Sequence, residues 1–137
     1  MGPSALSGRE VLLDHSAWAR LGERHLDVAK ALERGHLWVC LPFLLEAGYS
    51  ARTRDYEDHL ATLLTLPRVP IDMAIEQRAI DAQRQLASVS QHRLPPVDLI
   101  VAAAADVNDL GVLHYDSDYD LILERTDLEF ESVWLAP

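Results

Sequence analysis

Val11-Leu12-Leu13-Asp14 is a short apolar run near the start of the chain that ends in a carboxylate. The run predicts a buried strand, and Ser16–Leu21 after it predicts a helix that Asp14 or Ser16 caps. The arrangement returns at 112–115, a second buried strand that leads into Asp116 and a short helix at 117–125. Both acids therefore fall at the ends of predicted strands, where the ligands of parallel sheets bind.

The remainder of the chain also alternates between strand and helix patterns. Further strands are predicted at 36–40, 68–71 and 130–135. Further helices are predicted at 28–34, 56–66 and 97–109, and two more begin at Pro42 and at Asp72. This alternation is typical of a parallel sheet that is covered on both faces. We therefore expect an α/β fold, a three-layer α/β/α sandwich with a mainly parallel central sheet of four to five strands.

Size and composition describe an ordinary globular protein. The 137 residues predict a single domain over 1–137, and they are 49% apolar and 25% charged. No apolar run approaches the roughly 20 residues that cross a bilayer, and the first ten residues resemble no signal peptide. The single cysteine, Cys40, excludes an internal disulfide and fits a reducing compartment, so we expect a cytoplasmic protein with no membrane partner.

The formal net charge of −10 argues against nucleic acid as a partner, since such binding depends largely on Lys and Arg. Two features weaken that objection. Five of the acids belong to one proposed cluster, where a bound metal would offset their charge. The cations are almost all arginine, with Lys30 the only lysine, and arginine suits bidentate contacts to phosphate.

The proposed cluster consists of acids that follow or interrupt apolar runs: Asp14, Glu46, Asp98, Asp116 and Asp118. A buried carboxylate is unfavourable unless its charge is compensated. Two carboxylates about 4 Å apart repel by roughly 4 kcal/mol at an effective dielectric constant near 20. Such a group would either take up protons or hold a divalent cation, and an oxygen-only site suits Mg²⁺ or Mn²⁺. The pattern indicates a metal-dependent hydrolase that acts on a phosphodiester.

Four motifs in this order resemble those of PIN-domain nucleases. They are Asp14-His15-Ser16 after the first strand, Glu46 in Leu-Leu-Glu-Ala-Gly-Tyr-Ser, the helix start Pro96-Val97-Asp98-Leu99-Ile100-Val101-Ala102-Ala103, and Asp116-Ser117-Asp118-Tyr119 after a late strand. Their order, their spacing and the length of the chain are similar to those of the VapC toxins of bacterial toxin–antitoxin pairs. No single motif is specific, but four in register cover most of the chain.

This resemblance implies a Mg²⁺- or Mn²⁺-dependent endoribonuclease that cleaves loops of tRNA or rRNA. It also implies a homodimer, a cognate VapB-type antitoxin and a hetero-oligomer with that antitoxin. Carried over by position, Asp14, Glu46, Asp98 and Asp116 are the expected catalytic and metal-binding acids, with Asp118 as a fifth metal ligand. Ser16 matches the small hydroxyl residue that supports the first acid. Several family members have a single acid where this chain has both Asp116 and Asp118.

Other interpretations of the same residues remain open at this point. Asp14 and Asp116 could merely cap the helices that follow them. A histidine-dependent ribonuclease would need no metal, and a catalytically inactive PIN-like protein would act only by binding its antitoxin. Receiver domains and haloacid-type phosphatases are disfavoured, because the only lysine lies early and the first strand carries Asp14-His15-Ser16 rather than Asp-x-Asp. We also expect Trp38 and Trp134, which lie in strand-like apolar runs, to pack in the core.

Overall fold

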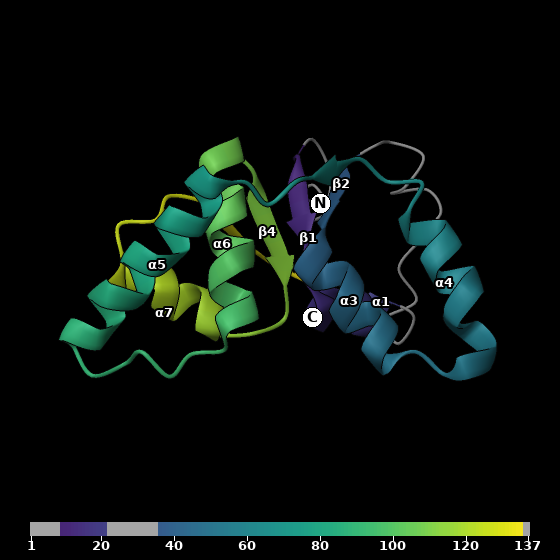
Figure 1. Ribbon diagram of the computed structural model, residues 1–137, viewed down its shortest axis with the longest axis horizontal. Helices are drawn as coiled ribbons and strands as arrows, with labels where there is room; N and C mark the ends of the chain where they lie inside the picture. The colour runs from purple at the N-terminus through teal and green to yellow at the C-terminus, as the bar shows by residue number, and fades with distance from the viewer. Residues whose placement is uncertain (1–8, 22–35, 136–137) are drawn as a thin grey trace, which may run out of the picture.

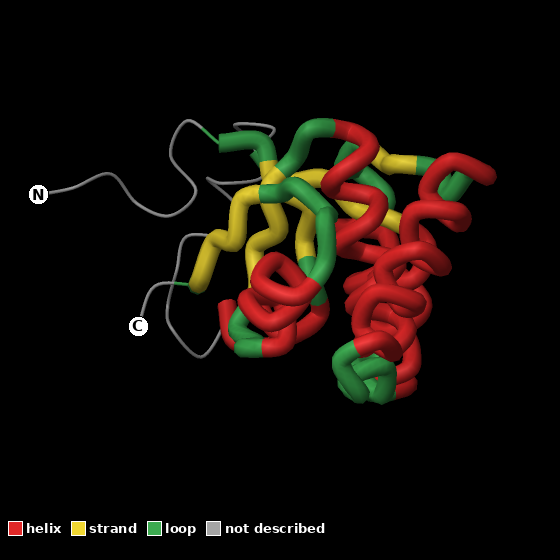
Figure 2. The backbone as a smooth tube through the Cα atoms, turned by 90° about the vertical axis from the view of Figure 1, so that its left-hand side faces the viewer, coloured by secondary structure: helices red, strands yellow, loops and turns green. Residues whose placement is uncertain are grey.

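The fold is built on a sheet of five parallel strands. The computed structural model describes residues 9–21 and 36–135. Its strands are β1 (Val11–Leu13), β2 (Leu37–Cys40), β3 (Arg68–Val69), β4 (Gly111–His114) and β5 (Glu131–Trp134). They lie in the order β3-β2-β1-β4-β5, and every neighbouring pair is parallel. The strands form one layer when viewed from the left-hand side of Figure 1 (Figure 2).

Helices cover the sheet on both sides. They are α1 (His15–Leu21), α3 (Leu41–Ser50), α4 (Tyr56–Leu63), α5 (Met73–Ser88), α6 (Pro96–Asn108) and α7 (Asp118–Arg125), with a 3₁₀ turn at Thr53–Asp55. In Figure 1, α5, α6 and α7 lie to the left of the strands, and α1, α3 and α4 lie to the right. The predicted three-layer α/β/α sandwich with a parallel sheet is therefore confirmed. The predicted helix at 28–34 lies outside the described residues.

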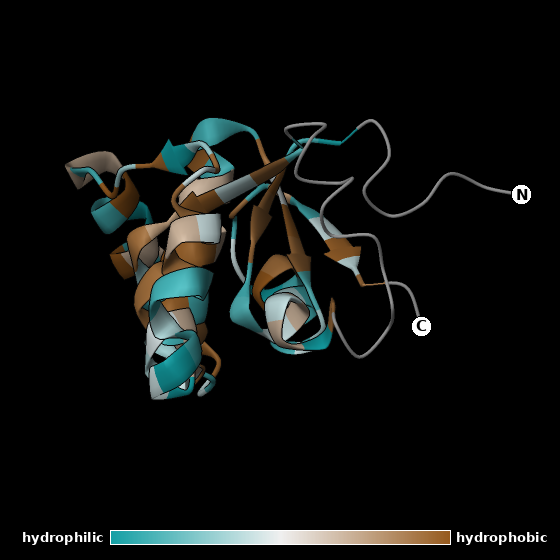
Figure 3. Ribbon diagram, turned by 90° about the vertical axis from the view of Figure 1, so that its right-hand side faces the viewer, coloured by the Kyte–Doolittle hydropathy of each residue, from teal (hydrophilic) through white to brown (hydrophobic). Residues whose placement is uncertain are grey.

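The apolar run at Val11–Leu13 forms the central strand β1. Val11, Leu12 and Leu13 have no exposed surface, because β2 and β4 flank the strand and helices cover both faces. A strand buried in this way reads as continuously apolar rather than alternating. Figure 3 shows the same pattern, with hydrophobic strands in the interior and hydrophilic bands on the outer helix surfaces.

Local signals set where the two long helices begin. Asp72 accepts a hydrogen bond from the backbone N–H of Ile75 at 3.0 Å and so caps α5, the helix that the sequence predicts from Asp72 onward. Pro96 occupies the first turn of α6, where its missing N–H leaves no hydrogen bond unmade. Because α6 is rich in buried alanine, it packs closely against the sheet and against α5. None of the described helices is both long and apolar enough to cross a bilayer.

The bounds of several elements and the position of one tryptophan differ from the expectations. Helix α4 ends at Leu63 rather than residue 66, and β3 covers only Arg68–Val69 rather than 68–71. Pro70 has no N–H to donate to a neighbouring strand, which is consistent with the early end of β3. The prediction that Trp134 packs in the core is wrong, since its side chain is 41% exposed. It lies on the edge strand β5, where Val133 is buried and Trp134 points to the opposite face.

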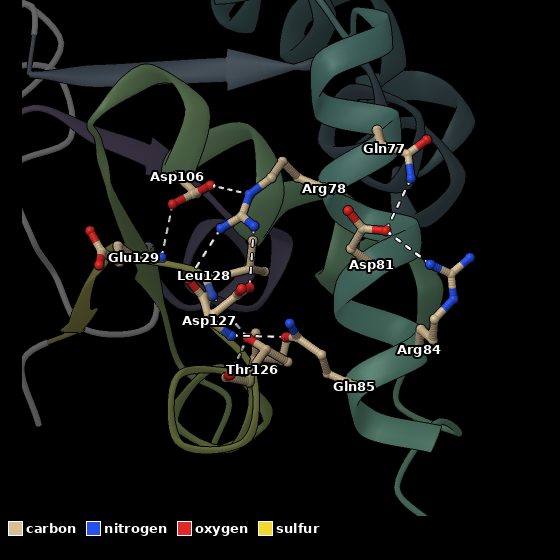
Figure 4. Close-up of polar contacts among 11 residues, drawn as sticks. Gln77, Arg78, Asp81, Arg84, Gln85, Asp106, Thr126, Asp127, Leu128 and Glu129 are labelled. Atoms are coloured by element: carbon tan, nitrogen blue, oxygen red, sulfur yellow. Dashed lines mark hydrogen bonds and ion pairs between the residues drawn. The ribbon is translucent and has the colours of Figure 1, made fainter. Parts of the chain in front are cut away.

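A cluster of ion pairs joins three elements on the side of the sheet that α5 covers (Figure 4). Arg78 on α5 contacts Asp106 on α6 with an Nε–Oδ2 distance of 2.8 Å. The same guanidinium contacts the Oδ1 of Asp127 at 3.2 Å and donates to its backbone carbonyl at 3.1 Å. This arginine therefore fixes α5 against α6 and against the segment that leads into β5.

Candidate metal centre

The predicted acids lie on elements that meet at one end of the sheet. Asp14 follows β1, Glu46 lies in the helix α3 that follows β2, and Asp116 and Asp118 follow β4. Asp98 lies in the first turn of α6, which packs against β1 and β4. Because β1, β2 and β4 are adjacent and parallel, their carboxyl ends bring these acids to the same edge.

Three of the acids form a compact group. Asp98, Asp116 and Asp118 each offer a carboxylate oxygen, and these oxygens lie within 4.8 Å of one another. Asp98 is buried, and its Oδ2 has no hydrogen-bond partner. A buried carboxylate oxygen with no donor is unusual, since buried polar atoms are normally hydrogen-bonded. This oxygen is therefore available to a ligand.

Glu46 and Asp14 complete the electrostatic environment, although neither belongs to the compact group. Burial, together with the smaller effects of the charges of Asp14, Asp116, Asp118 and Glu46, raises the pKa of Asp98 to about 8. Burial also raises the pKa of Glu46, with the charge of Asp14 as the next contribution. The structure thus brings the other four predicted acids within electrostatic reach of Asp98.

Asp14 is held in a fixed orientation by hydrogen bonds to both carboxylate oxygens. Its Oδ2 accepts from the Ser16 hydroxyl at 2.6 Å and from the Ser16 backbone N–H at 3.0 Å. The Ser16 hydroxyl oxygen in turn accepts from the backbone N–H of Tyr115 at 2.9 Å. Asp14 therefore begins helix α1 and also lies at the acidic cluster, so capping does not exclude a role in the site. Ser16 thus engages both lone pairs of Oδ2, which leaves Oδ1 as the oxygen that can take a further partner.

The other oxygen of Asp14 is bound by Tyr119, a residue to which the sequence assigned no role. The Tyr119 hydroxyl donates to Asp14 Oδ1 at 2.6 Å and lies 3.4 Å from Asp98 Oδ1. The side chain has no exposed surface, and burial raises the pKa of its hydroxyl well above the usual value, so the group remains a donor. Its position on the buried face of α7, one turn before Ile122, is the only sequence signal that could have indicated it.

His114 fixes the backbone that carries Asp116. Its Nδ1 accepts from the Asp116 backbone N–H at 3.2 Å, and its Nε2 lies 2.7 Å from the Ser132 hydroxyl. Ser132 donates to Asp120 at 2.7 Å, so its oxygen is free to accept from Nε2. Burial lowers the pKa of His114, which favours this neutral tautomer. The ring is occupied on both nitrogens and supports the loop.

The donor set suits a hard divalent cation. The cluster contains carboxylate oxygens only, which matches the preference of Mg²⁺ and Mn²⁺. The partnerless Oδ2 of Asp98 and the raised pKa of that group both indicate negative charge that lacks compensation within the described residues. The residues present therefore fit a metal.

Comparison with known sequences places the chain among characterised proteins. A PIN-domain profile matches residues 11–125. The chain is 35% identical over 133 residues to Ribonuclease VapC18 of Mycobacterium tuberculosis (strain H37Rv), covering 91% of this chain and 94% of that protein. It is 33% identical over 132 residues to Ribonuclease VapC2 of the same species (strain CDC 1551), covering 92% and 94%.

Solved structures show the same fold. DNA-bound VapBC from Salmonella typhimurium matches with a TM-score of 0.71 and 16% identity, covering 92% of this chain and 98% of that one. VapBC2 from Rickettsia felis, bound to a promoter DNA fragment, matches with a TM-score of 0.73 and 13% identity at the same coverage.

Proposed function

The chain belongs to the PIN-domain family, and on that basis we propose that it is a metal-dependent endoribonuclease, the toxin of a toxin–antitoxin pair. The observation that carries the proposal is the compact group of Asp98, Asp116 and Asp118, with the buried Oδ2 of Asp98 left without a partner. Relatives named as ribonucleases, which the chain matches over nine-tenths of its length, support the same reaction class.

Asp98, Asp116 and Asp118 would hold Mg²⁺ or Mn²⁺, with Asp14 and Glu46 completing the negative site. A cation bound there would supply Lewis-acid activation of water for attack on phosphorus and would offset charge on the leaving oxygen. Tyr119 and Ser16 orient Asp14, and the hydrogen bond from the Asp118 backbone N–H to Asp116 Oδ1, 3.0 Å long, orients Asp116. These contacts hold the acids in place before substrate arrives, which favours catalysis.

No histidine base is required by this arrangement. His114 is the buried histidine beside the cluster, and both of its ring nitrogens are engaged. The proposal therefore favours metal-assisted hydrolysis over a mechanism that uses the 2′-hydroxyl. Hydrolysis of this kind leaves a 5′-phosphate, whereas a histidine mechanism leaves a cyclic phosphate and tolerates a chelator.

The substrate and partners follow from the family. We propose single-stranded loops of tRNA or rRNA as substrate, because a flexible backbone can be bent into a narrow acidic site. Solved neighbours titled as VapBC complexes support a VapB-type antitoxin as partner, within a hetero-oligomer that contains a homodimer of this chain. A single domain and a cytoplasmic location remain predictions, and the free, buried Cys40 is consistent with the latter.

Cleavage of total RNA tests the proposal. We expect the purified protein to cleave tRNA or rRNA with Mn²⁺ present, and EDTA or Asp98→Asn to abolish cleavage. Asp109→Asn is the matched control, because it removes the same charge at the opposite end of α6, where the backbone is left-handed and tolerates asparagine. Cleavage that survives EDTA would contradict the proposal. Metal binding without cleavage would favour the alternative, an inactive protein that acts by binding its antitoxin.

A further inference from the structure

A row of three side chains extends from the acidic cluster across the carboxyl ends of β4 and β5. The guanidinium carbon of Arg20, on α1, lies 4.5 Å from the centroid of the Tyr115 ring. The Tyr115 ring meets that of Trp134 edge to face, with centroids 5.7 Å apart. We call Arg20, Tyr115 and Trp134 the arginine–aromatic strip.

The strip is connected directly to the candidate metal centre. The backbone N–H of Tyr115 donates to the Ser16 hydroxyl, which donates to Asp14. Arg20 lies one helical turn after Ser16 and donates to its backbone carbonyl at 3.3 Å. A ligand that extends from the acids along this edge of the sheet would therefore reach Arg20 and the Tyr115 ring next.

Arg20 retains capacity for an anion. Within residues 9–21 and 36–135, no carboxylate forms an ion pair with it, whereas Arg9, Arg78, Arg84 and Arg125 each pair with an acid. Its position over an aromatic ring holds the guanidinium without neutralising it. In a chain with a net charge of −10, a cation without an acidic partner beside a nuclease site suits a phosphate.

Trp134 supplies an exposed ring in a fixed orientation. Its indole N–H donates to Asp120 at 2.9 Å, and its ring packs edge to face on His114 with centroids 4.9 Å apart. Even so, 41% of the side chain is exposed. A large aromatic ring that is held still at the surface, with an arginine on the neighbouring Tyr115 ring, is the usual kind of platform for single-stranded nucleic acid.

We propose that the arginine–aromatic strip binds single-stranded RNA beside the acidic cluster, with Arg20 on a backbone phosphate and Trp134 stacked on a base. Tyr115 lies between them and keeps both in register with Asp14. The inference rests on the proposed ribonuclease function and assigns the path of the substrate away from the acids. It also explains how so acidic a protein can hold RNA, since Arg20 places a positive charge where the bound RNA strand extends away from the acidic cluster.

RNA binding without cleavage tests the strip. Anisotropy of a short fluorescein-labelled oligouridylate is measured in the Asp98→Asn background with Mg²⁺ at several salt concentrations. Arg20→Gln should weaken binding and lower the slope of log affinity against log salt by about 0.7, the value for one phosphate contact on a single strand. Trp134→Leu should weaken binding by about fivefold or more and leave the slope unchanged, because stacking carries no charge.

Arg9→Gln is the matched control, since Arg9 lies at the amino end of β1, away from the cluster, and its loss removes the same charge. Arg20→Lys guards against misfolding, because it keeps the charge and should keep the salt slope. Equal slopes for Arg20→Gln and Arg9→Gln would overturn the proposal. So would strip variants that weaken binding of the antitoxin while RNA binding is unchanged, since the strip would then be a protein-docking surface.

Cleavage by the unmodified protein, measured in parallel, separates the two hypotheses. If the protein cleaves RNA but Arg20→Gln leaves RNA binding unchanged, the proposed role of the strip is refuted and the ribonuclease function is not. Binding that depends on Arg20 without any metal-dependent cleavage supports the strip and refutes the proposed reaction.

Discussion

Asp98 should destabilise the metal-free protein, and Asp98→Asn should therefore make it more stable. The structure buries this carboxyl among four other acids and leaves its Oδ2 without a partner. The native state holds the proton of Asp98 more tightly than the unfolded chain does, because the pKa rises from 3.8 to about 8 on folding. The stability that this difference contributes is complete below pH 3.8 and is lost as the pH rises toward 8.

The size of the effect follows from the two pKa values. One pKa unit corresponds to about 1.4 kcal/mol, so the unfavourable contribution is roughly 2 kcal/mol at pH 5 and about 5 kcal/mol at pH 8. Asparagine has nearly the same shape and does not titrate. The free energy of unfolding of Asp98→Asn relative to the unmodified protein should therefore grow by about 3 to 4 kcal/mol between these pH values.

Urea unfolding of both proteins in EDTA at pH 5 and pH 8 measures this difference, with Asp109→Asn as the control for a lost surface charge. A difference that stays constant with pH, or an asparagine variant that is less stable at pH 8, would refute the reasoning. Addition of Mg²⁺ should narrow this difference at pH 8, because only the unmodified protein keeps the full cluster. Ligand at 100 times its dissociation constant adds about 2.7 kcal/mol.

Three further substitutions test the packing around the site. Tyr119→Phe should lower the free energy of unfolding by about 1 to 3 kcal/mol, because Asp14 Oδ1 loses its donor, and should weaken Mn²⁺ binding in calorimetry; unchanged values for both would contradict the assigned contact. Arg78→Lys should lower the melting temperature, since one ammonium cannot make the contacts that the guanidinium makes; an unchanged midpoint in thermal unfolding would mean that the ion pairs contribute nothing. Gly111→Ala should destabilise by about 1 to 3 kcal/mol, because its Cβ would lie 3.1 Å from a backbone carbonyl of β5 and 3.3 Å from two valine methyls. Gly48→Ala is its comparison, since its Cβ would meet only the movable Tyr56 ring, and a larger loss there in urea unfolding would contradict the packing argument.

The sequence was sufficient for those parts of the fold and site that depend on local pattern. The strand ahead of Asp14 was visible because it is continuously apolar, as central parallel strands are, and the strand ahead of Asp116 because it contains the apolar pair Val112-Leu113. The start of α6 was visible because Pro95 precedes the helix and Pro96 begins it. Asp98 was placed at the site by its position in that first turn, and the structure brings its oxygens to those of Asp116 and Asp118.

What the sequence could not supply were contacts across long separations. A tyrosine on an apolar helix face looks the same whether its hydroxyl meets solvent or a buried acid, so Tyr119 gave no sign of its bond to Asp14. Trp134 was misassigned because an apolar run does not reveal which strand lies at the edge of a sheet. Both the partner of the Tyr119 hydroxyl and the order of the strands depend on tertiary packing rather than on local pattern.

The bond between Tyr119 and Asp14 joins residues that are 105 positions apart, and it has a consequence for synthesis. A growing chain carries Asp14 and Glu46 long before β4 and α7 exist, so the early acids emerge from the ribosome without the groups that orient them. Asp116 and Asp118 arrive only after β1, β2, β3 and β4 have been made. A nascent chain that stops before α7 therefore cannot assemble the cluster, and a ribosome that is making this protein is not exposed to a working site until Asp118 and Tyr119 have been added.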